Sequence, residues 1–351
     1  DVPSGDTSWE YREKAVEEAV MGENSKLLKG LLIAGASTEY RDADNDQNIH
    51  GGALKGNTDV IQVLLDYGAN IDSRGNNDMT PLHWAASEGY SEVCKMLLEN
   101  EVEKNPVDNI GWTPLHNAAE KGHQDVVEFL IQFLPNDINP PDNRGWTVLH
   151  YAANHGQLNI IELYEELFDN VNPKQNSSDE FNERTPLHQG AQNGHLQIVE
   201  YLVNRIRTND KNPQDENGWT PLHLAASNGH ERIVSFLLGQ VTDKNPKAGD
   251  HWEQRTPLHD AARNGHLDVI KLILPHVEDI NPHASNGWSV VHYAAFNGRL
   301  NVVEFYASRI DDINLPLHSN FFTIKKQNLG WGNPCLSQAV LLGTEEYFAK
   351  W

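Results

Sequence analysis

A tetrapeptide, Thr-Pro-Leu-His, recurs along the chain and constrains its fold more than any other feature. Intact copies begin at Thr80, Thr113, Thr185, Thr220 and Thr256. Degenerate copies begin at Thr147 and Ser289, and an eroded copy ends at His50. The eight motif histidines are separated by 33, 33, 34, 38, 35, 36 and 33 residues. Such a period indicates a repeat array, in which each unit buries its apolar face only against its neighbours.

Each copy is followed by the same series of signals, which predicts two helices per unit. Thr220 before Pro221 places a hydroxyl N-cap ahead of a residue that suits the first helical turn. Gly229, nine residues after this Thr, ends the short first helix. The second helix carries an apolar stripe, and an Asn-Pro pair then ends it. One unit therefore consists of a turn, a short helix, a glycine, a second helix and a loop.

These units resemble ankyrin repeats, whose signature is Thr-Pro-Leu-His followed by paired alanines, such as Ala225-Ala226, and a glycine. The resemblance covers residues 42–310 as eight repeats and implies an all-α solenoid of about ten stacked helix-turn-helix units with β-hairpin-like loops. We therefore expect a single ankyrin-repeat domain over residues 1–351. Residues 11–41 keep only the second-helix signature and suit a divergent N-terminal capping repeat. Residues 328–351 suit a divergent C-terminal repeat.

Length and composition agree with a folded array. By length alone, 351 residues suggest two globular domains. A repeat array grows by adding units in one dimension, so the number of its domains does not follow from its length. No stretch approaches the ~18 apolar residues of a membrane span, and the first residues lack a signal segment. The chain holds two cysteines, Cys94 and Cys335, which favours a reducing compartment. We expect a soluble monomer of the cytoplasm or nucleus.

The charge of the chain excludes one class of partner. The 27 Lys and Arg residues against 50 Asp and Glu residues give a net charge of −23. Binding to nucleic acid needs clustered basic side chains that neutralise phosphates. We therefore expect no nucleic-acid partner, and we expect no insertion into a membrane.

Seventeen histidines raise the question of a metal site or an active site. Eight belong to the motif, and His123, His195, His230 and His266 follow helix-ending glycines. In the family, the motif histidine resembles a buried hydrogen-bonding strut. Stacked units repeat about every 8–10 Å, whereas zinc ligands lie within ~2 Å of the metal. No catalytic motif accompanies the histidines, so we expect no catalytic residue, no metal and no cofactor.

The resemblance implies a concave groove of hairpin tips and first helices that meets a protein or peptide partner. Ten of its forty-two positions in seven units are aromatic, although the chain is 8% aromatic, and its charges balance at five acids and five bases. Trp, Tyr and Arg dominate interface hot spots, so we expect a non-enzymatic protein-protein interaction scaffold. The candidate partner-binding residues are Trp84, Glu88, Trp112, Asn117, Lys121, Arg144, Trp146, Tyr151, His155, Arg184, Gln189, Trp219, Leu224, Arg255, Asp260, Arg263, Trp288, Tyr293 and Phe296.

Two interpretations stay open for some of these side chains. A Trp directly before the motif Thr or Ser can pack one hairpin on the next instead of binding a partner; such residues are Trp112, Trp146, Trp219 and Trp288. Other aromatic residues project from first helices, where their bulk has no expected packing role, and are the stronger candidates; these are Trp84, Tyr151, Tyr293 and Phe296.

Three alternatives to a free-standing scaffold also stay open. The chain resembles the cytosolic ankyrin segment of larger proteins such as channels, kinases and pore-forming toxins. The segment 169–182 and the insertion loop 311–327 are longer than a family loop, and they are the places where an active site would be built. Asn105 and Asn139, at the family's loop position, resemble targets of an asparaginyl hydroxylase.

Overall fold

The computed structural model of the chain describes residues 8–100, 103–134, 137–167, 170–175, 183–206 and 211–309. Within these residues the regular structure consists of eighteen α-helices and three short 3₁₀ helices, and the β-structure is limited to isolated bridges such as Pro141 to Thr147. The chain divides into two compact units, residues 1–179 and 180–351. The boundary falls inside the long segment 169–182.

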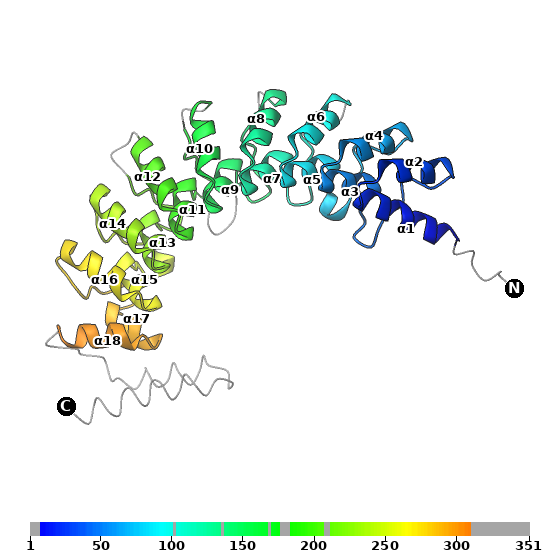
Figure 1. Cartoon of the computed structure of the whole chain (residues 1–351). Helices are drawn as coiled ribbons and strands as arrows, with labels where there is room; N and C mark the ends of the chain where they lie inside the picture. Colours follow the sequence, from blue (N-terminus) through cyan, green and yellow to red (C-terminus); the bar gives the residue numbers. More distant parts are fainter. Residues whose placement is uncertain are drawn as a thin grey trace. The chain divides into compact units, whose positions relative to one another are not determined.

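The first unit consists of five helix pairs stacked in sequence order (Figure 1). Each first helix packs against the first helix of the next pair; these helices are α1 (Ser8–Met21), α3 (Asn48–Lys55), α5 (Pro81–Glu88), α7 (Pro114–Lys121) and α9 (Val148–Asn154). The second helices form a parallel row of α2 (Ser25–Ile33), α4 (Thr58–Asp66), α6 (Ser91–Glu99), α8 (Gln124–Phe133) and α10 (Leu158–Glu165).

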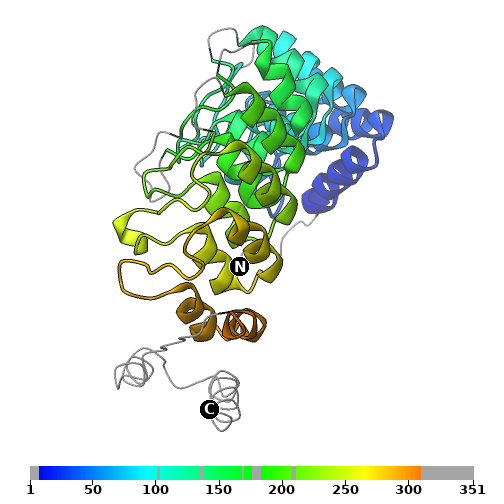
Figure 2. The ribbon, with the colours of Figure 1, turned by 90° about the vertical axis from the view of Figure 1, so that its left-hand side faces the viewer.

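The second unit repeats the arrangement with four helix pairs. Its first helices are α11 (Pro186–Asn193), α13 (Pro221–Ser227), α15 (Pro257–Asn264) and α17 (Val290–Phe296). Its second helices are α12 (Leu196–Arg205), α14 (Glu231–Gln240), α16 (Leu267–Ile273) and α18 (Leu300–Ala307). The 3₁₀ helices are η1 (Asn76–Asp78), η2 (Asp250–Trp252) and η3 (Leu274–His276). Figure 2 shows the yellow hairpins of this unit projecting to one side of its helices.

The core lies between the two rows of helices in each unit. Ala118 and Ala119 on α7 are fully buried, and so are Val126 and Val127 on α8. The paired alanines lack bulk, which lets the second helix approach closely, while its apolar stripe fills the space between the rows. Gly122 ends α7 at φ 79°, in the left-handed region that glycine adopts without steric cost. The predicted repeat unit is therefore confirmed.

Nine helix pairs lie within the described residues, against a prediction of about ten units. The tenth unit, residues 328–351, and the loop 311–327 lie outside the described residues, as does most of 169–182. Residues 11–41 carry more structure than expected, because the long helix α1 precedes α2 and packs on it. No helix in the described part of the chain has both the length and the apolar character needed to cross a membrane.

Candidate partner-binding face

Most of the motif histidines connect their first helix to the next hairpin, although Nε2 of His116 and of His292 has no hydrogen-bond partner among the described residues. His83 Nδ1 accepts the backbone N–H of Thr80 at 3.0 Å, and Nε2 donates to the carbonyl of Trp112 at 3.1 Å. His223 does the same with the N–H of Thr220 and the carbonyl of Arg255, each at 3.2 Å. Burial lowers the pKa of His83 to about 4 and that of His223 to about 3, so both rings are neutral at pH 7. The predicted structural role of the motif histidine is confirmed.

An aspartate five residues before the motif Thr closes the regular hairpins. Asp142 Oδ1 accepts the N–H groups of Arg144 and Trp146, both at 2.8 Å. Asp215 Oδ1 makes the same two contacts in its own hairpin, with the N–H of Trp219 at 2.8 Å. A side chain that accepts backbone N–H groups two and four residues ahead fixes the turn. These aspartates are not among the residues predicted from the sequence, although Asp108, Asp142 and Asp215 recur at this spacing.

Tyr151 and Tyr293 join neighbouring side chains instead of standing free. Tyr151 is 8% exposed, its ring centroid lies 4.5 Å from that of Trp112, and its hydroxyl donates to Asp142 Oδ2 at 2.6 Å. Tyr293 is 5% exposed and donates to a carboxylate oxygen of Glu253. The expectation that these two side chains have no packing role is wrong, because their rings are buried against tryptophans and their hydroxyls bond to hairpin carboxylates.

The tryptophans before the motif Thr or Ser both pack and remain partly exposed. Trp112 and Trp146 both contact Tyr151, at 4.5 and 5.2 Å between ring centroids. Trp219 meets Trp252 edge-on at 5.5 Å. Trp288 contacts Tyr293 at 5.3 Å and Phe296 at 5.1 Å. Each of these four tryptophan rings is only partly covered. Such a ring can pack against its neighbours and still offer its exposed part to a partner.

Two repeats of the second unit carry arginine where the others carry this tryptophan. Arg184 Nε lies 3.1 Å from Asp215 Oδ2, and Arg255 Nε lies 3.0 Å from Asp260 Oδ1. Both arginines are less than one tenth exposed. Burial raises the pKa of Asp260 to about 7, while Arg255 and Arg263 act in the opposite direction. Both arginines therefore stabilise the face through buried ion pairs and are not exposed to a partner.

The other predicted site residues divide by exposure. Asn117, Gln189 and Leu224 are buried on first helices, so they support the face without forming its surface. Trp84 is partly exposed on α5. The exposed members are Glu88, Lys121, Arg144, His155, Arg263 and Phe296. The structure thus brings together one aromatic group in the first unit, around Tyr151, and one in the second unit, around Arg255 and Tyr293.

The two proposed hydroxylation sites occupy different surroundings. Asn139 Oδ1 accepts the N–H of Leu149 at 3.2 Å and so anchors α9 to the preceding loop. Asn105 Nδ2 lies 3.4 Å from an oxygen of Asp137. Both side chains are partly buried. Hydroxylation of Asn105 and Asn139 stays a prediction.

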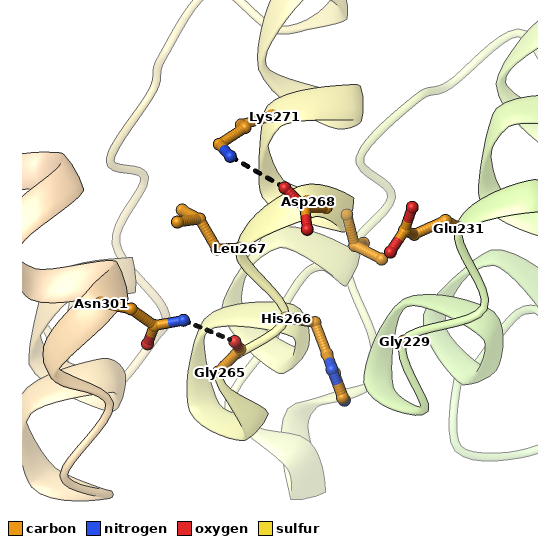
Figure 3. Close-up of a pocket in the computed structure, with 9 residues that line it drawn as sticks. Gly229, Glu231, Gly265, His266, Leu267, Asp268, Lys271 and Asn301 are labelled. Atoms are coloured by element: carbon orange, nitrogen blue, oxygen red, sulfur yellow. Dashed lines mark hydrogen bonds and ion pairs between the residues drawn. The ribbon is translucent and has the colours of Figure 1, made fainter.

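A pocket of about 300 Å³ lies on the second-helix side of the second unit (Figure 3). Several of its polar side chains are already bonded to one another or to the backbone. Lys271 Nζ pairs with Asp268 Oδ1 at 2.8 Å, Asn301 Nδ2 donates to the carbonyl of Gly265 at 3.2 Å, and His266 Nε2 donates to that of Ser227 at 3.1 Å. The described residues hold no group of three His, Cys, Asp or Glu side chains arranged to bind a metal ion.

Comparison with known proteins agrees with this architecture. The family model described as ankyrin repeats (3 copies) matches residues 16–108, 100–174, 162–248 and 242–316. The comparison with curated proteins finds no match. The matched segments extend over most of the chain and contain the motif histidines, the closing aspartates and every described helix pair except the first half of α1. The chain therefore belongs to the ankyrin-repeat family.

Proposed function

We propose that this chain is a non-enzymatic scaffold that binds a protein or peptide partner on the face formed by its hairpins and first helices. Proteins of the ankyrin-repeat family generally act as protein-protein interaction modules. The catalytic and cofactor roles that the histidines suggested find no support in their positions, because the motif histidines are buried and bonded to the backbone. A site of action in the cytoplasm or nucleus is part of the same proposal.

The observation that carries the proposal is the placement of the tryptophans. Six of the chain's nine tryptophans lie on hairpins or first helices and are partly exposed; they are Trp84, Trp112, Trp146, Trp219, Trp252 and Trp288. A partly exposed indole ring has a large apolar area left to bury and a polar N–H to place. Such residues dominate the energetics of protein interfaces.

The face is also preformed. Its hairpins are held by Asp142 and Asp215 and by the motif histidines, so a partner meets a hairpin backbone that is already in position. Preorganisation reduces the conformational entropy lost on binding and so favours affinity. This is the physical advantage of a stacked array as a receptor.

Charge indicates what kind of partner the face accepts. Its exposed charged residues are of both signs: Glu88 and Glu216 are acidic, whereas Lys121, Arg144 and Arg263 are basic. The partly exposed Glu120 and Glu253 add further negative charge. The buried arginines Arg184 and Arg255 are matched by Asp215 and Asp260. A face without a strong charge favours a partner that is itself close to neutral.

The test uses the purified chain to capture partners, with two pairs of matched charge reversals. Lys121→Glu with Arg263→Glu alters the face, whereas Lys95→Glu with Arg232→Glu alters exposed positions on the second helices α6 and α14. Each pair changes the net charge by the same amount. We expect the first pair to release retained proteins and the second pair to keep them. Release by the second pair alone would show that the partner binds the opposite side.

A further inference from the structure

Six residues of the second unit form one continuous group, which we name the aromatic row; its members are Trp219, Trp252, Arg255, Trp288, Tyr293 and Phe296. Trp219 contacts Trp252 at 5.5 Å, and Trp288 contacts both Tyr293 at 5.3 Å and Phe296 at 5.1 Å. The guanidinium carbon of Arg255 joins the two halves, because it lies 5.7 Å from the Trp219 ring, 5.3 Å from Trp252 and 5.9 Å from Tyr293.

The spacing of the row selects one peptide conformation. Residues before the motif Thr or Ser in successive repeats are Trp219, Arg255 and Trp288, and adjacent first helices pack about 8–10 Å apart. A polyproline II helix has three residues per turn and rises ~3.1 Å per residue, so it presents the same face about every 9 Å. A β-strand presents the same face about every 7 Å, which does not match the repeat.

The hydrogen-bonding groups of the row point to the same ligand. The indole Nε1 of Trp219 and the Nη2 of Arg255 are covered and have no hydrogen-bond partner. Buried donors without a partner are rare and unfavourable. The carbonyls of an α-helical peptide are bonded internally, whereas those of a polyproline II peptide are free. A ligand carbonyl can satisfy the Trp219 donor once the indole ring turns its N–H edge outward.

Charge argues against strongly acidic or basic ligands. The Arg255 guanidinium is less than one tenth exposed and lies 3.0 Å from the buried carboxyl of Asp260, so the centre of the row offers no free exposed charge to a ligand. Prolyl rings are apolar and pack on the faces of tryptophan rings, and the stiff peptide loses little entropy on binding. Both properties fit a neutral row of partly exposed aromatic rings.

We propose that the second unit binds a proline-rich segment of its partner in the polyproline II conformation along the aromatic row. Prolyl rings pack on Trp219, Trp252 and Trp288, and a peptide carbonyl accepts the indole N–H of Trp219. This inference rests on the proposed scaffold function and specifies its ligand class. It also specifies a register, in which every third residue of the ligand meets an equivalent position of the next repeat.

The probe is a fluorescein-labelled peptide of twelve prolines, which spans ~37 Å and so covers about four repeats. Its binding to the full chain is measured by fluorescence anisotropy. We expect Trp252→Ala to weaken binding at least tenfold, and Trp219→Phe, which keeps a ring but removes the N–H donor, to weaken it severalfold. The matched control is Tyr201→Ala on the second helix α12, which we expect to bind like the unmodified chain. Circular dichroism confirms that each variant is folded.

A pair of peptides with identical composition tests the register. Pro-Gln-Ala repeated four times places proline at every third position, and we expect it to bind more tightly than a shuffled version. The inference is overturned if twelve prolines bind no better than a Gly-Ser peptide of equal length, or if twelve glutamates or twelve lysines bind better. If the proline peptides fail while Lys121→Glu with Arg263→Glu still releases captured proteins, only the ligand class is wrong. If both tests fail, the scaffold proposal fails as well.

Discussion

Arg255 Nε lies 3.0 Å from Oδ1 of Asp260, and the two side chains are only 7% and 1% exposed. The preceding repeat has Trp219 and Leu224 at the same two positions, without any ion pair. Equivalent positions around the start of the first helix therefore hold a buried charged pair in one repeat and an apolar pair in the preceding one. This relationship allows the energetic role of the pair to be measured directly.

Breaking this pair should be costly, whereas replacing it should not. Asp260→Leu leaves the Arg255 charge buried without its partner, so we expect a loss of about 3–5 kcal/mol of stability. The double variant Arg255→Trp with Asp260→Leu copies the preceding repeat, and we expect it to be as stable as the original chain or more stable. Urea unfolding followed by circular dichroism measures both. A double variant as unstable as Asp260→Leu alone would show that the pair is required for the local fold.

Acid should destabilise the protein because of its buried histidines. The folded-state pKa is about 4 for His83 and about 3 for His223, below the ordinary value of 6.5. Between these values the unfolded chain binds more protons, so each histidine stabilises the fold above pH 6.5 and loses this contribution as the pH falls toward 4. At about 1.4 kcal/mol per pKa unit, these shifts correspond to roughly 3 kcal/mol for His83 and roughly 5 kcal/mol for His223. We expect the urea midpoint to fall between pH 7 and pH 5.

Asp260 opposes this trend and supplies a control. Its folded-state pKa of about 7 lies above the ordinary value of 3.8, so the folded state binds more protons and gains stability as the pH falls from 7 to 4. Asp260→Asn removes that gain. The variant should therefore lose stability more steeply than the original chain between pH 7 and pH 5. Equal slopes would contradict the assignment of the raised pKa to Asp260.

The hairpin position two residues before the motif Thr carries local strain in some repeats. Glu183 has φ 65° there, whereas Gly218 occupies the equivalent place at φ 73°. A non-glycine residue in this region costs about 1–2 kcal/mol, partly offset by the flexibility of glycine in the unfolded chain. We expect Glu183→Gly to stabilise the protein by about 0.5–1 kcal/mol, measured as a higher urea midpoint.

The converse substitution should be unfavourable. A Cβ at Gly218 would lie 2.5 Å from the backbone N of Gly249, in the next hairpin. We expect Gly218→Ala to destabilise the protein by about 2–4 kcal/mol, because backbone atoms must move to relieve the contact. If Gly218→Ala were neutral and Glu183→Gly harmful, the strain argument would be wrong.

The Tyr151 hydroxyl should contribute to stability and not directly to binding. Tyr151→Phe keeps the ring contacts with Trp112 and Trp146 but removes the hydrogen bond to Asp142. We expect a loss of about 1–3 kcal/mol, because a hydrogen bond to a charged acceptor is lost. Thermal unfolding measures the loss, and partner capture should be unchanged at temperatures where the variant is folded. A loss of capture without any loss of stability would show that the hydroxyl contacts the partner.

The local part of the fold could be predicted from the sequence. Thr220 and Pro221 begin a helix and Gly122 ends one through contacts within a few residues, so their types alone determine those structures. The motif histidines could be predicted as struts because their period places the same side chain at the same point of successive units, and most of them make the same contact. Helix α1 carries no such motif, and its existence became evident only from its packing against α2 and α3.

Only the tertiary structure showed which residues of the candidate face are exposed to a partner and which are buried beneath it. Tyr151 and Arg255 had the residue types of interface hot spots, but each is covered by rings from neighbouring hairpins, Trp112 and Trp146 for the tyrosine and Trp219 and Trp252 for the arginine. The repeat period predicts which positions lie on the same face of the array. It does not predict how exposed each side chain is, because exposure depends on the residue types at neighbouring positions, and these differ from repeat to repeat.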